Sequence, residues 1–193
     1  MLERINFMLG FLPWILFASI AGNTMHSLRI AIVVCLVTVL VFGFRHLKKG
    51  FILTWGTLLF FIINLIMIVF LQDAWVARHI AVLANGSLAA IAWFSLLAGR
   101  PFTLQYAREH VPEELWKSPK FIHKNRVITA VWGSVFLFST ATSFIRVHYN
   151  APRTWIYQVL AIIVIQGGIA FTIWYPKREK GGSKAKLSND FNM

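Results

Sequence analysis

The chain has 193 residues, of which 58% are hydrophobic and only 13% are charged. Ordinary globular domains contain about 45–50% apolar residues; a soluble chain of this length could not cover the excess, whereas a lipid bilayer covers it. The formal net charge of +12 does not favour nucleic acid as a partner, because the basic residues lie in short loops between apolar runs and form no basic domain.

Six continuous apolar runs follow one another along the chain. Each holds roughly 17–23 residues, the length that a helix needs to cross about 30 Å of hydrocarbon at 1.5 Å per residue. The runs do not alternate between apolar and polar residues, so transmembrane strands are not expected. They cover residues 5–21, 28–44, 51–71, 76–98, 127–145 and 155–174. The sequence therefore predicts an all-α fold, with one polytopic transmembrane helical bundle of six spans over residues 1–176.

The first run allows two interpretations. Arg4 before an apolar stretch, with small residues at 19 and 21, resembles a cleavable signal peptide. Glu3 offsets the charge of Arg4, which favours a retained first span. Pro13 lies inside this run and is expected to kink a helix, unless neighbouring groups satisfy the carbonyl that the missing N–H leaves free.

Polar residues inside the spans are the first places to look for function, because lipid makes unpaired polar groups costly. Asn64 lies near the middle of the third run, Asn85 in the fourth and Gln166 near the middle of the sixth. Such amides usually bond across a helix interface, and alanines at 77, 81 and 89 place Asn85 in a stripe that suits close packing. Alternatively, the three amides line a transport cavity.

Residues 100–126 form the one sizeable segment between the runs. Aromatic and aliphatic side chains are interleaved there with Arg and Lys, which suits a segment lying in the headgroup region of a membrane. The candidate lipid-facing residues are Trp116, Lys117, Lys120, Phe121 and Lys124. An amphipathic connector that packs on the ends of the helices is the other interpretation. Residues 177–193 form a polar, basic tail, which their composition predicts to be disordered.

The charges in the loops orient the spans. With the N-terminus in the cytoplasm, fifteen of the nineteen Lys and Arg residues fall on the cytoplasmic side. The other four are Arg29, Arg78, Arg146 and Arg153. An odd number of spans would place a strongly basic segment outside, so both termini are predicted to be cytoplasmic.

The sequence contains no assembled set of catalytic or metal-binding residues. Five of the six histidines lack a histidine or cysteine three or four residues away, and His79, near Asp73 and Arg78, is interpreted as an interfacial group. Neither a Gly-x-Ser-x-Gly elbow nor a glycine-rich phosphate loop occurs. The single cysteine, Cys35, excludes an internal disulfide. The chain is therefore predicted not to be an enzyme, and no cofactor or metal is expected.

Several short features resemble the intracellular septation protein A family, small inner-membrane proteins of Gram-negative bacteria. They are Phe11-Leu12-Pro13 before an apolar span, the basic turn after the second run, the Gly99-Arg100-Pro101 junction that leads into a loop with a tryptophan, and Trp132 in the fifth run. The resemblance covers roughly residues 5–178 as an architecture.

This resemblance implies a multi-pass protein of the bacterial inner membrane. Its expected role is in envelope maintenance or septation, through contacts with other membrane proteins in the lipid bilayer, and it carries over no catalytic residues. The alternative is a small transporter or lipid-handling protein that uses Asn64, Asn85 and Gln166 in a midplane polar cavity. A third class, less favoured, is a membrane enzyme that acts on a lipid near His79 or the 100–126 loop.

Overall fold

The computed structural model of the chain describes residues 2–22, 24–149 and 154–190, with side chains described for 10–22, 24–149, 156, 157 and 159–176. Within these ranges the chain forms helices joined by short turns, and no strand occurs. The all-α prediction is therefore confirmed.

The helices, in chain order, are α1 (Leu2–Ile20), α2 (Met25–Phe42), α3 (Phe44–Lys48), α4 (Ile52–Asn64), the π-helical η1 (Leu65–Phe70), α5 (Ala74–Leu97), α6 (Phe102–Arg108), the 3-10 turn η2 (Glu113–Leu115), α7 (Pro119–His148) and α8 (Thr154–Asp190). In the described part of the chain, five of them are long and apolar enough to cross a membrane. These are Met25–Phe42, Ile52–Phe70, Ala74–Leu97, Pro119–His148 and Val159–Pro176. The first helix contributes a shorter apolar stretch, Gly10–Ile20.

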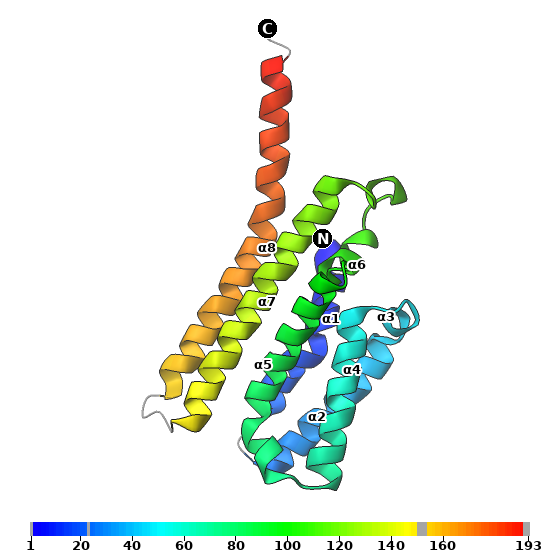
Figure 1. The fold of residues 1–193 in the computed structure, drawn as a ribbon. Coiled ribbons are helices and arrows are strands. Elements are labelled where there is room, and N and C mark those ends of the chain that lie inside the picture. The colour runs from blue at the N-terminus through cyan, green and yellow to red at the C-terminus, as the bar shows by residue number, and fades with distance from the viewer. Residues whose placement is uncertain (1, 23, 150–153, 191–193) are drawn as a thin grey trace.

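Successive long helices run in opposite directions, and both marked ends of the chain lie at the same end of the bundle (Figure 1). The short helices α3 and α6 lie at that end too. We call it the basic end, because α3, the start of α7 and the turns beside them carry Arg45, Lys48, Lys49, Lys117 and Lys120. The opposite end, called here the far end, holds the turns after α1 and η1 and the last residues of α7.

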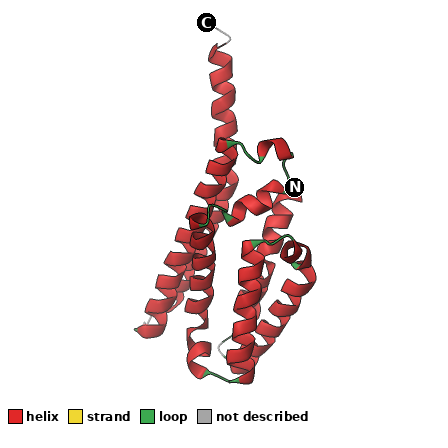
Figure 2. Cartoon of the chain, turned by 45° about the vertical axis from the view of Figure 1, so that its right-hand side comes forward, coloured by secondary structure: helices red, strands yellow, loops and turns green. Residues whose placement is uncertain are grey.

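Helix α7 makes its most extensive contact with α5, and α8 packs along α7. The turned view shows α8 continuing beyond the other helices (Figure 2). Only Gly168 is buried among the described side chains of α8, so α8 is a peripheral helix of the bundle.

Side-chain caps start the helices at the far end. The Asp73 carboxylate accepts a hydrogen bond from the Val76 N–H at 2.9 Å, and the Thr24 hydroxyl accepts one from the Ser27 N–H at 3.2 Å. Each cap satisfies a backbone donor that a helix N-terminus leaves unpaired. The caps fix where α5 and α2 begin.

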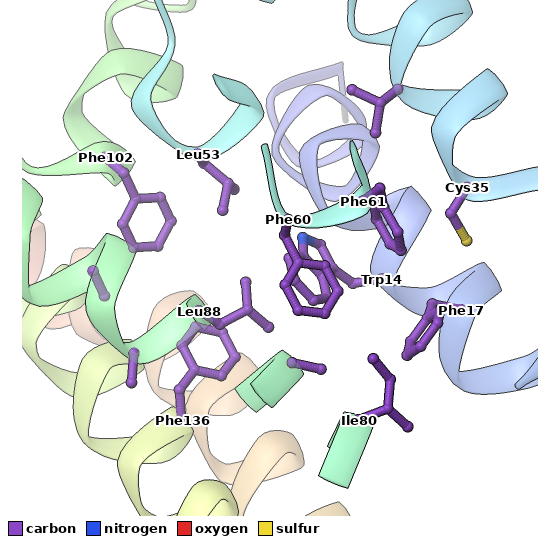
Figure 3. Packing of buried hydrophobic residues seen from close by; sticks show 14 of the residues in the cluster. Trp14, Phe17, Cys35, Leu53, Phe60, Phe61, Ile80, Leu88, Phe102 and Phe136 are labelled. Atoms are coloured by element: carbon purple, nitrogen blue, oxygen red, sulfur yellow. The ribbon is translucent and has the colours of Figure 1, made fainter. Parts of the chain in front are cut away.

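The hydrophobic core draws on α1, α2, α4, α5, α6 and α7, and part of it is an aromatic cluster of side chains from α1 and α4 (Figure 3). The Trp14 ring lies 5.0 Å from Phe60 and 5.4 Å from Phe61, measured between centroids. The Trp14 indole N–H donates to the Thr57 hydroxyl at 2.9 Å. This bond pairs the one polar atom of the indole, which would otherwise be buried without a partner.

Helix α1 continues through Pro13 to Ile20. The Cys35 thiol of α2 donates to the carbonyl of Pro13 at 3.1 Å. This bond joins α2 to the proline's own carbonyl; the carbonyl that the missing N–H leaves free lies four residues earlier. Cys35 is buried, in keeping with a small packing residue.

Two helices extend past the apolar runs that predict them. Helix α7 begins at Pro119 rather than near residue 127, because proline is well suited to the first helical position and the Lys and Arg that follow are good helix formers. Helix α8 continues to Asp190, through residues that composition predicts to be disordered. Lys, Arg, Glu and Ala in that segment also favour a helix.

Candidate functional site at the basic end

Helix α6 is inserted into the basic end of the bundle, where it contacts α7, α1 and α5. Phe102, Leu104 and Tyr106 are buried. The N–H of Phe102 donates to the Ser95 hydroxyl at 3.1 Å, and the Thr103 hydroxyl donates to the carbonyl of Asn125 at 2.9 Å. These bonds join α6 to the end of α5 and the start of α7. The first part of the 100–126 segment is therefore a helix that packs in the core.

Tyr106 reaches from α6 across to α1 and α4. Its hydroxyl lies 3.3 Å from the hydroxyl of Thr54, and its ring packs edge-on against Phe51, 4.9 Å between centroids. A Cβ built on Gly10 would come within 2.5 Å of the Tyr106 oxygen. Gly10 therefore makes the room that the phenol occupies.

A cluster of charges joins α3 to α6. The Glu109 carboxylate accepts a hydrogen bond from Lys49 and lies 3.5 Å from the ring nitrogen Nε2 of His46. The His46 ring stacks on Phe51 with 4.6 Å between centroids. Gln105 adds two bonds to the same turn, since it accepts from the N–H of Ile52 at 2.8 Å and donates to the carbonyl of Gly50 at 3.2 Å.

The electrostatics of this cluster follow from its geometry. Burial alone would raise the pKa of the Glu109 carboxyl, but the hydrogen bond and charge of Lys49, together with the interaction with His46, outweigh burial and hold that pKa below its ordinary value of 4.5. Burial raises the pKa of Tyr106 to about 12, helped by the negative charge of Glu109 and opposed by the Thr54 hydrogen bond. Glu109 is thus a carboxylate and Tyr106 a neutral phenol at pH 7.

The five candidate lipid-facing residues differ in exposure. Lys117 and Lys120 are exposed, whereas Trp116, Phe121 and Lys124 are half-buried. The Trp116 indole N–H donates to the carbonyl of Val111 at 3.2 Å, and the Arg108 guanidinium lies over the Trp116 ring at 5.5 Å. Trp116 therefore closes the turn that follows α6.

The three intramembrane amides lie in different surroundings. Asn64 is buried where α4 passes into η1; its amide N–H donates to the carbonyl of Phe60 at 2.8 Å, and its oxygen has no partner within the described structure. Asn85 donates to the carbonyl of Ala81 at 2.8 Å and lies 3.5 Å from the Ser143 hydroxyl on α7. Gln166 is exposed on α8.

Sequence reasoning missed α6 and the charge cluster around Glu109. The sequence places residues 102, 104 and 106 in a segment that either lies in the headgroup region or packs on the ends of the helices, and it predicts no helix there; the structure shows a short helix inserted among the others. The signal that could have found α6 is the run Pro101–Leu104, which is apolar except for one threonine and directly follows the turn at Gly99. The partners of Glu109 come from α3, some sixty residues earlier in the chain, and no local pattern indicates that pairing.

Within the described residues, no three His, Cys, Asp or Glu side chains are grouped so that they could hold a metal ion. Glu109 pairs with Lys49 and His46, and these contacts fix α3 against α6. Lys48, Lys117 and Lys120 stay exposed. No protein-family model matches the chain, and neither a curated protein nor a solved structure shows significant similarity to it.

Proposed function

We propose that the chain is a bacterial inner-membrane protein with six crossings and both termini in the cytoplasm. In the described part of the chain five helices have the length and composition of membrane spans, and α1 adds a shorter apolar stretch. The long helices alternate in direction, so that both marked chain ends lie on the side of the basic end (Figure 1). The excess of Lys and Arg at that end supports a cytoplasmic orientation for it.

We further propose that the protein is a non-enzymatic scaffold for envelope maintenance or septation, which acts through contacts of its basic end with other membrane proteins. The observation that carries this proposal is the way α6 is locked into the bundle by the His46–Glu109–Lys49 cluster. A locked α6 holds an exposed basic surface in a fixed shape, and a preformed surface loses little entropy on binding. Acidic segments are the partner chemistry that this surface fits.

The alternative, a transporter with a midplane polar cavity, has less support. It needs Asn64, Asn85 and Gln166 to face a common space. Asn64 is packed in the core, Asn85 lies at the contact of α5 with α7, and Gln166 is on the outside of α8. Their surroundings fit three separate packing or surface positions better than one cavity.

Photo-crosslinking in living cells tests the scaffold proposal. A photo-reactive amino acid replaces Lys117 at the basic end, and the matched control replaces Tyr149, which is exposed at the far end. We expect discrete crosslinked partners from position 117, and we expect Lys117→Glu placed beside a probe at Lys120 to weaken them. The absence of discrete products from both basic-end positions, in a protein that is folded and inserted, would overturn the proposal.

A further inference from the structure

An open apolar groove of about 460 Å³ runs along the outside of the bundle between α7 and α8. Val127, Val131, Ser134 and Phe138 line it from α7, and Val164 lines it from α8. The groove has roughly fifteen times the volume of one water molecule, which is on the order of 30 Å³. It is therefore large enough for a substantial length of hydrocarbon chain.

The contacts between α7 and α8 explain why this groove stays open. The indole N–H of Trp132 donates to the Thr172 hydroxyl at 3.0 Å, and Gly168 lies against Val135. Val135 also lines the groove and forms the edge at which α7 meets α8, whereas Trp132 points away from Val131 and Ser134, because successive residues of an α-helix are turned by about 100°. Helix α8 is thereby held to one side, and the neighbouring face of α7 stays uncovered.

The same face of α7 continues into two lysines at the basic end. Lys120 and Lys124 precede Val127 and Val131 by seven residues each. Seven residues are almost two helical turns, so each lysine shares a face with its valine and lies about 10 Å further along the axis. Lys120 is exposed and Lys124 half-buried. The groove therefore has an apolar floor within the hydrophobic part of α7 and positive charge at one mouth.

We propose that this groove binds an anionic phospholipid, with one acyl chain between α7 and α8 and the phosphate headgroup against Lys120 and Lys124. The charge of the lysines complements the headgroup phosphate, and the uncharged floor suits the acyl chain. A helix of a second copy would need an acidic residue at the lysines. The whole chain has only seven Asp and Glu residues, and Glu109 among them is already paired. The inference shares Lys120 with the scaffold proposal but does not depend on it, because the groove itself lies between α7 and α8.

Native mass spectrometry of the full-length protein in detergent tests this, with phosphatidylglycerol as the anionic probe and phosphatidylcholine as its zwitterionic control. We expect one phosphatidylglycerol per chain to bind more tightly than phosphatidylcholine. Replacing both lysines by glutamine should lower the affinity for phosphatidylglycerol about twenty-five-fold, since each basic residue near an anionic surface raises the binding constant by a factor of about five. The matched control is Arg126→Gln with Lys48→Gln, which removes two basic-end charges from other faces and should leave the affinity unchanged.

A second pair of variants tests the apolar part of the groove. Ser134→Trp should fill the groove and lower the affinity for both lipids, whereas Leu137→Trp, on an exposed face of α7 outside the groove, should not. Thermal unfolding of the variants shows that they remain folded. Equal affinity for the two lipids, or phosphatidylglycerol binding that survives Ser134→Trp, would overturn the proposal. A wild-type dimer that Ser134→Trp converts to monomer would also overturn it, in favour of a second copy in the groove.

Discussion

Gly10 and Tyr106 show how one missing side chain permits a contact between distant elements. Gly10→Ala should destabilise the fold by about 1–3 kcal/mol, because the added methyl group overlaps the Tyr106 phenol, which is itself buried and cannot easily move. Unfolding in a denaturing detergent measures the change. Tyr106→Phe should recover part of the loss in the double variant, since it removes the atom nearest to the new methyl group. Gly167→Ala is the control, because a Cβ there meets nothing within 4 Å.

Substitution by leucine should change the free energy of unfolding differently at Asn64 and at Asn85. Asn64 is buried with an unpaired oxygen, so Asn64→Leu removes an unsatisfied acceptor and should leave the free energy of unfolding unchanged or raise it by about 1–3 kcal/mol. Asn85→Leu loses the contact to Ser143 on α7, which should cost about 0.6 kcal/mol. Denaturant unfolding of both variants checks this. A marked loss of stability in Asn64→Leu would mean that its oxygen has a bound partner, such as a water molecule.

Glu109 should make the stability of the protein depend on pH in the acid range. Its folded-state pKa lies below the ordinary 4.5, so its contribution is fully present above pH 4.5 and is lost as the pH falls through the folded-state value. The difference in unfolding free energy between the wild type and Glu109→Gln should therefore be constant at neutral pH and shrink below 4.5. Glu113→Gln, at an exposed acid of η2, is the matched control for the substitution itself. A difference between wild type and Glu109→Gln that is independent of pH would contradict the ion-pair explanation.

At the scale of the helices, α8 depends on one small residue for its contact with α7. A Cβ on Gly168 would lie 3.3 Å from Val135, whereas Gly167 faces open space. Gly168→Leu should push α8 away from α7, and Gly167→Leu should not. Spin labels at Leu137 and Ile162, both exposed, report the separation by electron–electron distance measurement in a Cys35→Ser background. We expect a longer, broader distribution for Gly168→Leu only; identical distributions for the two leucine variants would show that the contact lies elsewhere.

Hydropathy predicted where the long helices lie, because an apolar stretch of about twenty residues has few alternatives to a helix in lipid. It could not predict where α7 begins, since a helix continues into polar residues such as Lys120 and Lys124 without any apolar signal. The amino-acid composition also did not predict the π-helical turn after Asn64. Helix α6 is too short for a periodic pattern, and its burial depends on Gly10 of α1 and Thr54 of α4, which are distant in sequence.

The whole molecule combines a tightly packed aromatic core with charge concentrated at one end. The cluster around Trp14 holds α1, α2 and α4 together, while α6 closes the basic end against α7 and α5. The sequence alone predicted the charge asymmetry, because loop residues can be counted without a structure. It could not predict that the basic end is closed by a buried helix, since that depends on contacts such as Glu109 with Lys49 across the fold.

The proposed topology makes a prediction about access from each side of the membrane. In a Cys35→Ser background, single cysteines replace Lys117 at the basic end, His148 at the far end and Lys186 in the C-terminal segment. The dominance of Lys and Arg in the basic-end loops should keep that end in the cytoplasm. A membrane-impermeant maleimide added to intact spheroplasts should therefore label only the cysteine at 148, and the other two should react only after permeabilisation. Labelling at 186 but not at 117 in intact cells would mean an odd number of crossings after the loop, and labelling at both would mean the inverted orientation. Either result would reject six crossings with both ends inside.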